Sequence, residues 1–143
     1  MTVFVDTGVI YAEFDGSANR NETAVQAMDA VYEGEFGQPF TSDYVYDEVV
    51  TLTHKRTGRF EAARTVGEKV RGAADFPDVY SFAYVDPTVF EAAIDVFERY
   101  DDQGLSFTDA TTVALVNDKD IDALLSFDDD FDGLVERIDP ASA

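Results

Sequence analysis

Short runs that favour β-strands alternate with longer segments of helical periodicity along the chain. The strand-like runs are TVFV (2–5), PFTS (39–42), YSFAYV (80–85) and DALLSF (122–127). Between them, apolar residues recur at helical spacing. This alternation predicts a single α/β domain over residues 1–143, with a mostly parallel central sheet.

Local signals set the bounds of the predicted helices. Gly58 separates two of them, and Asp86-Pro87 is a strong helix start because proline suits the first helical position. Residues 117–120 read as a turn before the last strand. The predicted elements are a short helix or turn over 9–14 and helices over 21–35, 43–57, 59–73, 87–100 and 106–117.

The composition favours a folded protein of the cytoplasm. Apolar residues make up 45% of the chain and aromatic residues 13%, which argues against disorder. There is no cysteine, so disulfides and thiolate chemistry are excluded. The N-terminus lacks the pattern of a signal peptide, and no apolar run reaches the roughly 18–20 residues needed to span a bilayer. We therefore expect a cytoplasmic protein without a membrane segment.

The chain is strongly acidic. Thirty acidic residues face ten basic ones, which gives a formal net charge of −20. The acids are spread along the chain, so they belong to a folded surface that repels itself in dilute salt. At molar salt the screening length is only about 3 Å. The composition therefore suits a high-salt cytoplasm, as in halophilic archaea.

Four acidic residues stand out by their position. Asp6 ends the first strand, and Asp128 ends the fourth. Glu48 borders the apolar stripe of the helix after the second strand, and Asp109 is in the first turn of its helix. Ligands of open α/β sheets bind at the carboxyl ends of the strands, so these four side chains are expected to converge there.

Carboxylates that converge need a cation, because like charges at one spot otherwise force some of them to stay protonated. Oxygen ligands without cysteine or a nearby histidine favour Mg²⁺ or Mn²⁺ over zinc. Such ions lower the pKa of bound water and stabilise charge on a phosphodiester. The four acids are thus candidate metal ligands and catalytic residues.

Each acid also has a purely structural interpretation. Asp6 is placed to cap the following helix, and Ser106 with Asp109 matches a capping box. Glu48 suits a half-buried position on a helix flank, and Asp128 suits an acidic surface. Both interpretations stay open at this stage.

The cluster SFDDDFDG (126–133) invites two other interpretations. Asp128, Asp130 and Asp132 match the first half of an EF-hand loop, but the twelfth position is Asp139 where glutamate is expected, and a strand-like run precedes the loop. A phosphatase with an aspartyl nucleophile at Asp6 would want a second aspartate two residues later, where this chain has glycine. Neither is favoured.

Four motifs together resemble the PIN-domain nucleases, and are most similar to VapC-type toxins of toxin–antitoxin pairs. They are VDTGV near the start, DEVV around position 48, GLSFTDA (104–110) and LSFDDDFDG (125–133). The resemblance runs through nearly the whole chain. It implies a three-layer α/β/α fold and a Mg²⁺- or Mn²⁺-dependent endoribonuclease. It also implies a homodimer and a cognate antitoxin protein that covers the cleft.

The resemblance assigns roles to individual residues. The four family acids map to Asp6, Glu48, Asp109 and Asp128. Two further positions carry secondary roles: Thr7 as an assisting hydroxyl, and Asp130 as an additional polar neighbour. Asp129 and Asp132 are then left to the acidic surface.

RNA binding by so acidic a protein requires local contacts. Six of the ten basic residues lie in the stretch 55–71, either as ordinary surface pairing or as a cationic face for an anionic polymer. The candidates for contacts with the RNA backbone are Lys55, Arg56 and Arg59. Three tyrosines are considered for stacking, with a core or antitoxin-facing position preferred: Tyr11, Tyr44 and Tyr46. A PIN-like module that binds a partner without catalysis remains the alternative function.

Overall fold

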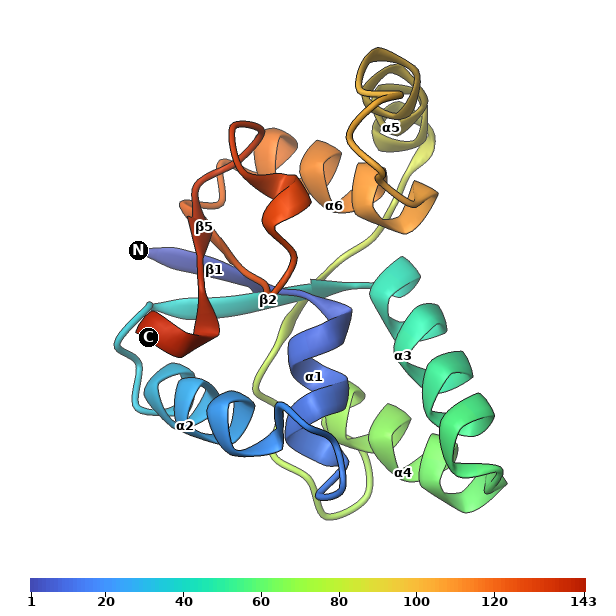
Figure 1. Ribbon diagram of the computed structural model, residues 1–143, viewed down its shortest axis with the longest axis vertical. Helices are drawn as coiled ribbons and strands as arrows, with labels where there is room; N and C mark the ends of the chain where they lie inside the picture. Colours follow the sequence, from blue (N-terminus) through green and yellow to red (C-terminus); the bar gives the residue numbers. More distant parts are fainter.

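A five-stranded parallel sheet forms the centre of the protein, and the computed structural model describes it with the rest of residues 1–143 (Figure 1). The strands lie in the order β3-β2-β1-β4-β5, and every pairing is parallel. Their bounds are β1 Thr2–Val5, β2 Gln38–Ser42, β3 Ser81–Ala83, β4 Ala123–Leu125 and β5 Arg137–Ile138. The predicted parallel α/β class is confirmed.

Helices cover both faces of this sheet. In Figure 1, α5 and α6 lie on one side and α1 and α2 on the other, while α3 packs against both α1 and α4. The bounds are α1 Thr7–Phe14, α2 Asn21–Tyr32, α3 Asp43–Thr57, α4 Phe60–Arg71, α5 Pro87–Arg99 and α6 Phe107–Asp118. The three-layer α/β/α arrangement is therefore confirmed. No helix combines the length and the apolar character that crossing a membrane requires.

The core explains why the strands read as uninterrupted apolar runs. In β1, Val3, Phe4 and Val5 are fully buried because helices cover both faces of the sheet. The helix α6 is buried at seven successive positions, from Ala110 to Val116. Its first turn is consequently held in a fixed place beside the ends of the strands.

Polar side chains and a glycine set the ends of the helices, largely as the sequence predicts. Ser42 Oγ accepts a hydrogen bond from the backbone N–H of Val45 at 3.1 Å and so caps α3. Gly58 ends the same helix in the left-handed region, at φ 68°. Asp86 caps α5 with a 2.9 Å bond from the N–H of Val89.

The order of the strands creates a switch point between β1 and β4. From β1 the chain moves outward to β2 and then β3, and it returns across the sheet to place β4 on the other side of β1. The first crossover carries α1 and α2, and the return carries α5 and α6. Ligands of open parallel sheets bind beyond the carboxyl ends of the strands at such a point.

Three elements near the C-terminus were not predicted. The strand β5 has two residues and the 3₁₀ helices η1 (Asp129–Phe131) and η2 (Pro140–Ser142) have three each. Elements this short carry no hydrophobic period that a sequence can reveal. The predicted third and fourth strands are also shorter than expected, because only their central residues pair in the sheet.

Candidate metal centre

All four predicted acids line one open cleft beyond the carboxyl ends of β1 and β4. The cleft has a volume of about 520 Å³. Asp6 comes from the end of β1, Glu48 from α3, Asp109 from the first turn of α6 and Asp128 from the residues after β4. The switch point of the sheet therefore brings together side chains that are up to 122 positions apart in the sequence.

Asp6 is the only one of the thirty acidic residues that is buried, with 7% of its surface exposed. Its Oδ1 accepts a 2.9 Å bond from the N–H of Thr7, and its Oδ2 accepts a 2.7 Å bond from Ser126 Oγ. Burial raises the pKa of Asp6 to about 7, the Ser126 bond opposes this, and the charges of Asp109 and Glu48 add to the rise. The folded protein thus keeps one carboxylate in the cleft whose burial destabilises its ionised form.

Asp109 combines the two roles that the sequence left open. Its Oδ2 accepts a 3.0 Å bond from the N–H of Ser106, and its own N–H donates to Ser106 Oγ at 3.0 Å, which completes a capping box. The same carboxyl group lines the cleft. Burial raises the pKa of Asp109, and the charges of Glu48 and Asp128 raise it further. The cap holds the carboxylate in place among other acids.

Ser126 connects the two strand ends and was not singled out from the sequence. Its fully buried hydroxyl donates to Asp6 and accepts a 3.0 Å bond from the backbone N–H of Asp128. Asp6 also bonds β4 through its backbone N–H, which donates to the Leu125 carbonyl at 3.1 Å. A hydroxyl at the end of an otherwise apolar buried run was the available signal, because a buried polar group needs partners.

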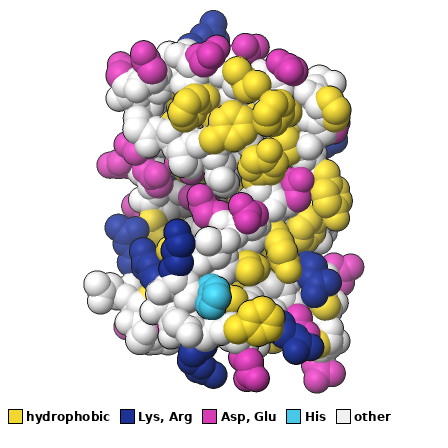
Figure 2. All heavy atoms as spheres, turned by 90° about the vertical axis from the view of Figure 1, so that its right-hand side faces the viewer, with side chains coloured by type: hydrophobic (Ala, Val, Ile, Leu, Met, Phe, Trp, Pro, Cys, Tyr) yellow, Lys and Arg dark blue, Asp and Glu magenta, His cyan; other side chains and the backbone are white.

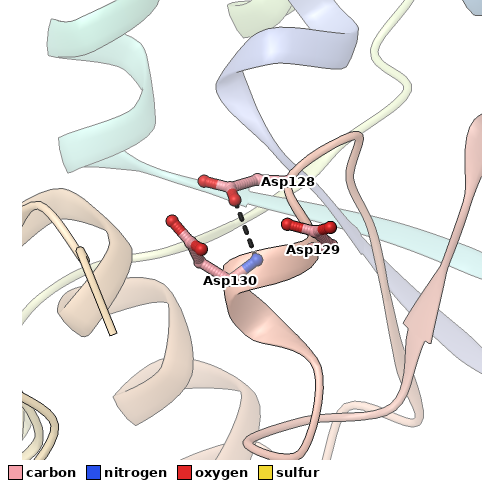
Figure 3. A group of neighbouring side chains, drawn as sticks. All are labelled: Asp128, Asp129 and Asp130. Carbon is pink, nitrogen blue, oxygen red and sulfur yellow. Dashed lines mark hydrogen bonds between the residues drawn. The ribbon is translucent and has the colours of Figure 1, made fainter. Parts of the chain in front are cut away.

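The neighbouring aspartates form a second, tighter group. Asp128, Asp129 and Asp130 each place a carboxylate oxygen within 4.8 Å of the others (Figure 3). The N–H of Asp130 donates to Asp128 Oδ1 at 2.9 Å and starts the 3₁₀ helix η1. Asp130 therefore lies beside Asp128 but does not line the cleft, whereas exposed Asp129 does. Asp129 is exposed, as expected for the acidic surface, and it also contributes to the lining of the cleft.

The structure does not support an EF-hand in this segment. Asp132 pairs with Arg137 at 2.7 Å and is not part of the group formed by Asp128, Asp129 and Asp130. A strand precedes the loop, and a 3₁₀ helix lies within it, where an EF-hand requires a helix–loop–helix.

Two further groups complete the lining of the cleft. Thr7 is predicted to assist, and its buried Oγ1 has no hydrogen-bond partner within the protein. Arg20, which precedes α2, is the one basic residue in the lining. Its guanidinium lies 4.6 Å from the centre of the Phe127 ring. Arg20 was not predicted from the sequence, because it lies far from the other basic residues along the chain.

The predicted basic residues are not gathered at the cleft. Of Lys55, Arg56 and Arg59, all exposed, only Arg56 lines a groove that adjoins the cleft. Lys69 pairs with Glu13 at 3.1 Å and lines a separate, largely apolar cavity of about 620 Å³. Arg56 and Lys69, both in the stretch 55–71, thus line different depressions of the surface.

The three tyrosines follow the preferred structural interpretation. Tyr11 is buried, and Tyr44 packs against Phe107 with ring centres 6.2 Å apart. Tyr46 is partly buried and lies against Gly67 of α4. None of them lines the acidic cleft.

The donor set of the cleft fits a hard divalent cation. It offers carboxylate oxygens and a free threonine hydroxyl, with neither cysteine nor histidine in the lining. The four predicted carboxylates are spaced more widely than the Asp128–Asp130 group. Such spacing suits an ion like Mg²⁺ that keeps several waters. Burial raises the pKa values of Asp6 and Asp109, and repulsion between the acids adds to the rise; a cation would relieve that repulsion.

The three-layer fold, its parallel sheet and the acidic cleft at the switch point place the protein in a class of α/β proteins with a carboxylate site suited to a metal ion. Comparison with protein-family models matches residues 3–136 to the PIN domain. The chain therefore belongs to the PIN-domain family, and the resemblance seen in the sequence motifs is confirmed.

Individual relatives agree with this assignment. The chain is 24% identical over 132 residues to a protein named VapC ribonuclease from Archaeoglobus fulgidus, an alignment that covers 92% of this chain and 80% of the relative. It is similar to the crystal structure of VapC20 from Mycobacterium tuberculosis, described as a Sarcin-Ricin loop cleaving toxin. That match has a TM-score of 0.75 and 28% identity, and it covers 90% of this chain and 92% of the other.

A more distant structure supports the fold alone. A toxin–antitoxin complex from Klebsiella pneumoniae matches with a TM-score of 0.67 and 18% identity, covering 96% of this chain and 97% of that one.

Proposed function

We propose that the protein is a divalent-metal-dependent endoribonuclease that hydrolyses RNA phosphodiester bonds as the toxin of a toxin–antitoxin pair. The observation that carries the proposal is the position of Asp6. A chain with thirty acids buries one, at the switch point of the sheet, and surrounds it with Glu48, Asp109 and Asp128. A structural carboxylate has no need of three acidic neighbours, whereas a cation site does.

We assign Asp6 and Asp109 as the strongest direct ligands of Mg²⁺ or Mn²⁺. Glu48 and Asp128 would complete the site, directly or through water. When bound, the ion would supply Lewis acidity, stabilising charge on the phosphodiester and lowering the pKa of water. The protein supplies rigidity, because Ser126 and the Ser106 cap hold the carboxylates of Asp6 and Asp109 before any ligand arrives.

The nuclease is tested by incubating RNA with the purified protein in molar KCl. We expect cleavage with Mg²⁺ or Mn²⁺, loss of cleavage with a chelator, and recovery when the metal is returned. Cleavage that persists at full rate in the chelator contradicts the metal site. Intact RNA under every metal condition favours the alternative of a partner-binding module without catalysis.

We also propose two protein partners. The first is a cognate antitoxin that covers the cleft, with both proteins in the cytoplasm. One solved structure of similar fold is a toxin–antitoxin complex, and the VapC-type relatives favour such a partner. The test is whether the partner protein suppresses RNA cleavage when added in equimolar amount.

The second partner is another copy of this chain. Two groups of aromatic side chains, together called the aromatic face, lie close to α5 and to the edge strand β3. One consists of Tyr44, Phe90, Phe97 and Phe107, and the other of Phe82 and Tyr84. Figure 2 shows hydrophobic side chains gathered on the upper part of this side of the molecule. Phe90 and Phe97 remain 40% and 44% exposed, and exposed apolar patches mark interaction sites. We expect Phe97→Ser to convert a dimer to a monomer in sedimentation; an unchanged dimer would place the interface elsewhere.

A further inference from the structure

A groove continues from the acidic cleft along the protein surface. It has a volume of about 710 Å³ and lies between α1, the loop before α2 and α3. The groove and the cleft share Gly8, Arg20 and Leu52 in their linings, so they form one continuous channel. Each part has the size of a site for a nucleotide-sized ligand, roughly 300–1,000 Å³.

Arg56, near the end of α3, lines the groove and is held there by an aromatic ring. Its guanidinium lies 5.0 Å from the centre of the Tyr11 ring. The Tyr11 hydroxyl donates to Asp15 Oδ2. Asp15 Oδ1 in turn accepts bonds from the N–H and Oγ of Ser17 at 2.9 and 2.7 Å. The one carboxylate of the groove is therefore engaged by Tyr11 and its own loop.

Neither arginine of the channel forms an ion pair within 4.0 Å, and Asp15 acts on Arg56 only over a longer distance. Ion pairs in the protein involve Lys69, Lys119 and Arg137. Arg20 and Arg56 instead stack on aromatic rings, although the chain holds three acids for each base. Stacking fixes the plane of a guanidinium and leaves its N–H donors free. Free, oriented donors in such an acidic protein indicate an anionic ligand.

We propose that this groove holds backbone phosphates of the RNA next to the bond that is cut, with Arg20 beside the cleft and Arg56 further along. The inference rests on the proposed ribonuclease function. Arginine pairs with phosphate through paired N–H donors, a contact whose geometry survives where long-range attraction does not. At molar salt the screening length is about 3 Å, so only such direct contacts can hold a phosphate on a protein of net charge −20.

The experiment compares Arg56→Ala with Arg99→Ala, which removes the same charge from an exposed position at the end of α5, outside the channel. Two substrates are used: a single-stranded RNA, and bis(p-nitrophenyl) phosphate, which has no flanking phosphates. For Arg56→Ala we expect KM for RNA to rise about tenfold with kcat little changed. Its rate on the small diester should equal that of the wild type, and Arg99→Ala should match the wild type on both substrates.

RNA binding without cleavage supplies an independent readout. In an Asp109→Asn background without divalent metal, fluorescence anisotropy gives the affinity for RNA over a series of KCl concentrations. Removing one phosphate contact should lower the slope of log affinity against log salt by about 0.7. The inference is overturned if Arg56→Ala leaves both KM and this slope unchanged, or if it slows both substrates equally.

These outcomes separate the groove from the proposed function. If the wild type cleaves no RNA, the ribonuclease proposal fails, and the binding slope still decides whether the groove takes phosphates. If the wild type cleaves and Arg56→Ala behaves like Arg99→Ala, the groove inference alone fails.

Discussion

Replacing Asp6 by asparagine is expected to stabilise the metal-free protein. The folded protein raises the pKa of Asp6 from 3.8 to about 7, mainly by burial. Above pH 7 the wild type must therefore hold an ionised carboxylate that is more stable in the unfolded chain. Asparagine keeps the shape and carries no charge, so the cost disappears.

The size of the effect follows from the two pKa values. A difference of about three pH units, at about 1.4 kcal/mol each, gives about 4 kcal/mol at pH 7 and above. Because the folded pKa is the higher one, the unfolded state loses its proton first. The stability of the wild type therefore falls as pH rises from about 4 to about 7. The gain from Asp6→Asn shrinks to about 2 kcal/mol near pH 5.

The assay is thermal unfolding in molar KCl with a chelator, at about pH 5 and about pH 8. For a chain of this length, 4 kcal/mol corresponds to a rise in Tm of roughly 10 °C. Asp102→Asn, at an exposed turn position, is the matched control and should stay within about 0.5 kcal/mol of the wild type. Burial of Asp6 does not destabilise the protein as expected if Asp6→Asn behaves like this control at the higher pH, or if its gain in stability is the same at both pH values.

Other perturbations probe the support of the site. Mg²⁺ or Mn²⁺ should raise the Tm of the wild type and leave that of Asp6→Asn nearly unchanged, since a ligand stabilises only the form that binds it; equal shifts in both would place the ion elsewhere. Ser126→Ala should lower the free energy of unfolding by about 2 kcal/mol, because Asp6 Oδ2 and the N–H of Asp128 lose their hydrogen-bond partner. Chemical denaturation measures the change, and an unchanged denaturation midpoint would contradict the prediction. Leu124→Ala, in a fully buried central strand, should cost about 2–5 kcal/mol in the same assay without changing metal affinity.

The sequence predicts the fold well where signals are local or periodic. Gly58 and Asp86-Pro87 set helix ends where expected, and the apolar runs mark four of the five strands. The strand β5 was missed because its two residues pair with β4 only after the chain has folded around η1. Such a strand depends on its neighbours and not on its own sequence.

The acidic residues of the site could be predicted from the sequence, but the residues that contact and position them could not. Asp6 and Asp128 could be found because they end strands. Ser126 and Arg20 could not, because their roles depend on contacts between distant segments. The Ser126 hydroxyl, after β4, donates to Asp6 at the end of β1, and Arg20 stacks on Phe127. The basic stretch shows the opposite case, where neighbours in sequence diverge in space. Arg56 faces the channel, while Lys69 faces a cavity elsewhere.

The catalytic role of the acidic cleft is tested most directly by the rate of RNA cleavage as a function of Mn²⁺ concentration for Asp109→Asn, Asp102→Asn and the wild type. Both variants remove one negative charge, but only Asp109 lies in the acidic cleft. We predict that Asp109→Asn loses at least about a hundredfold in rate at every metal concentration while Asp102→Asn follows the wild-type curve. Full cleavage by Asp109→Asn would contradict the assignment of the cleft as the catalytic metal site.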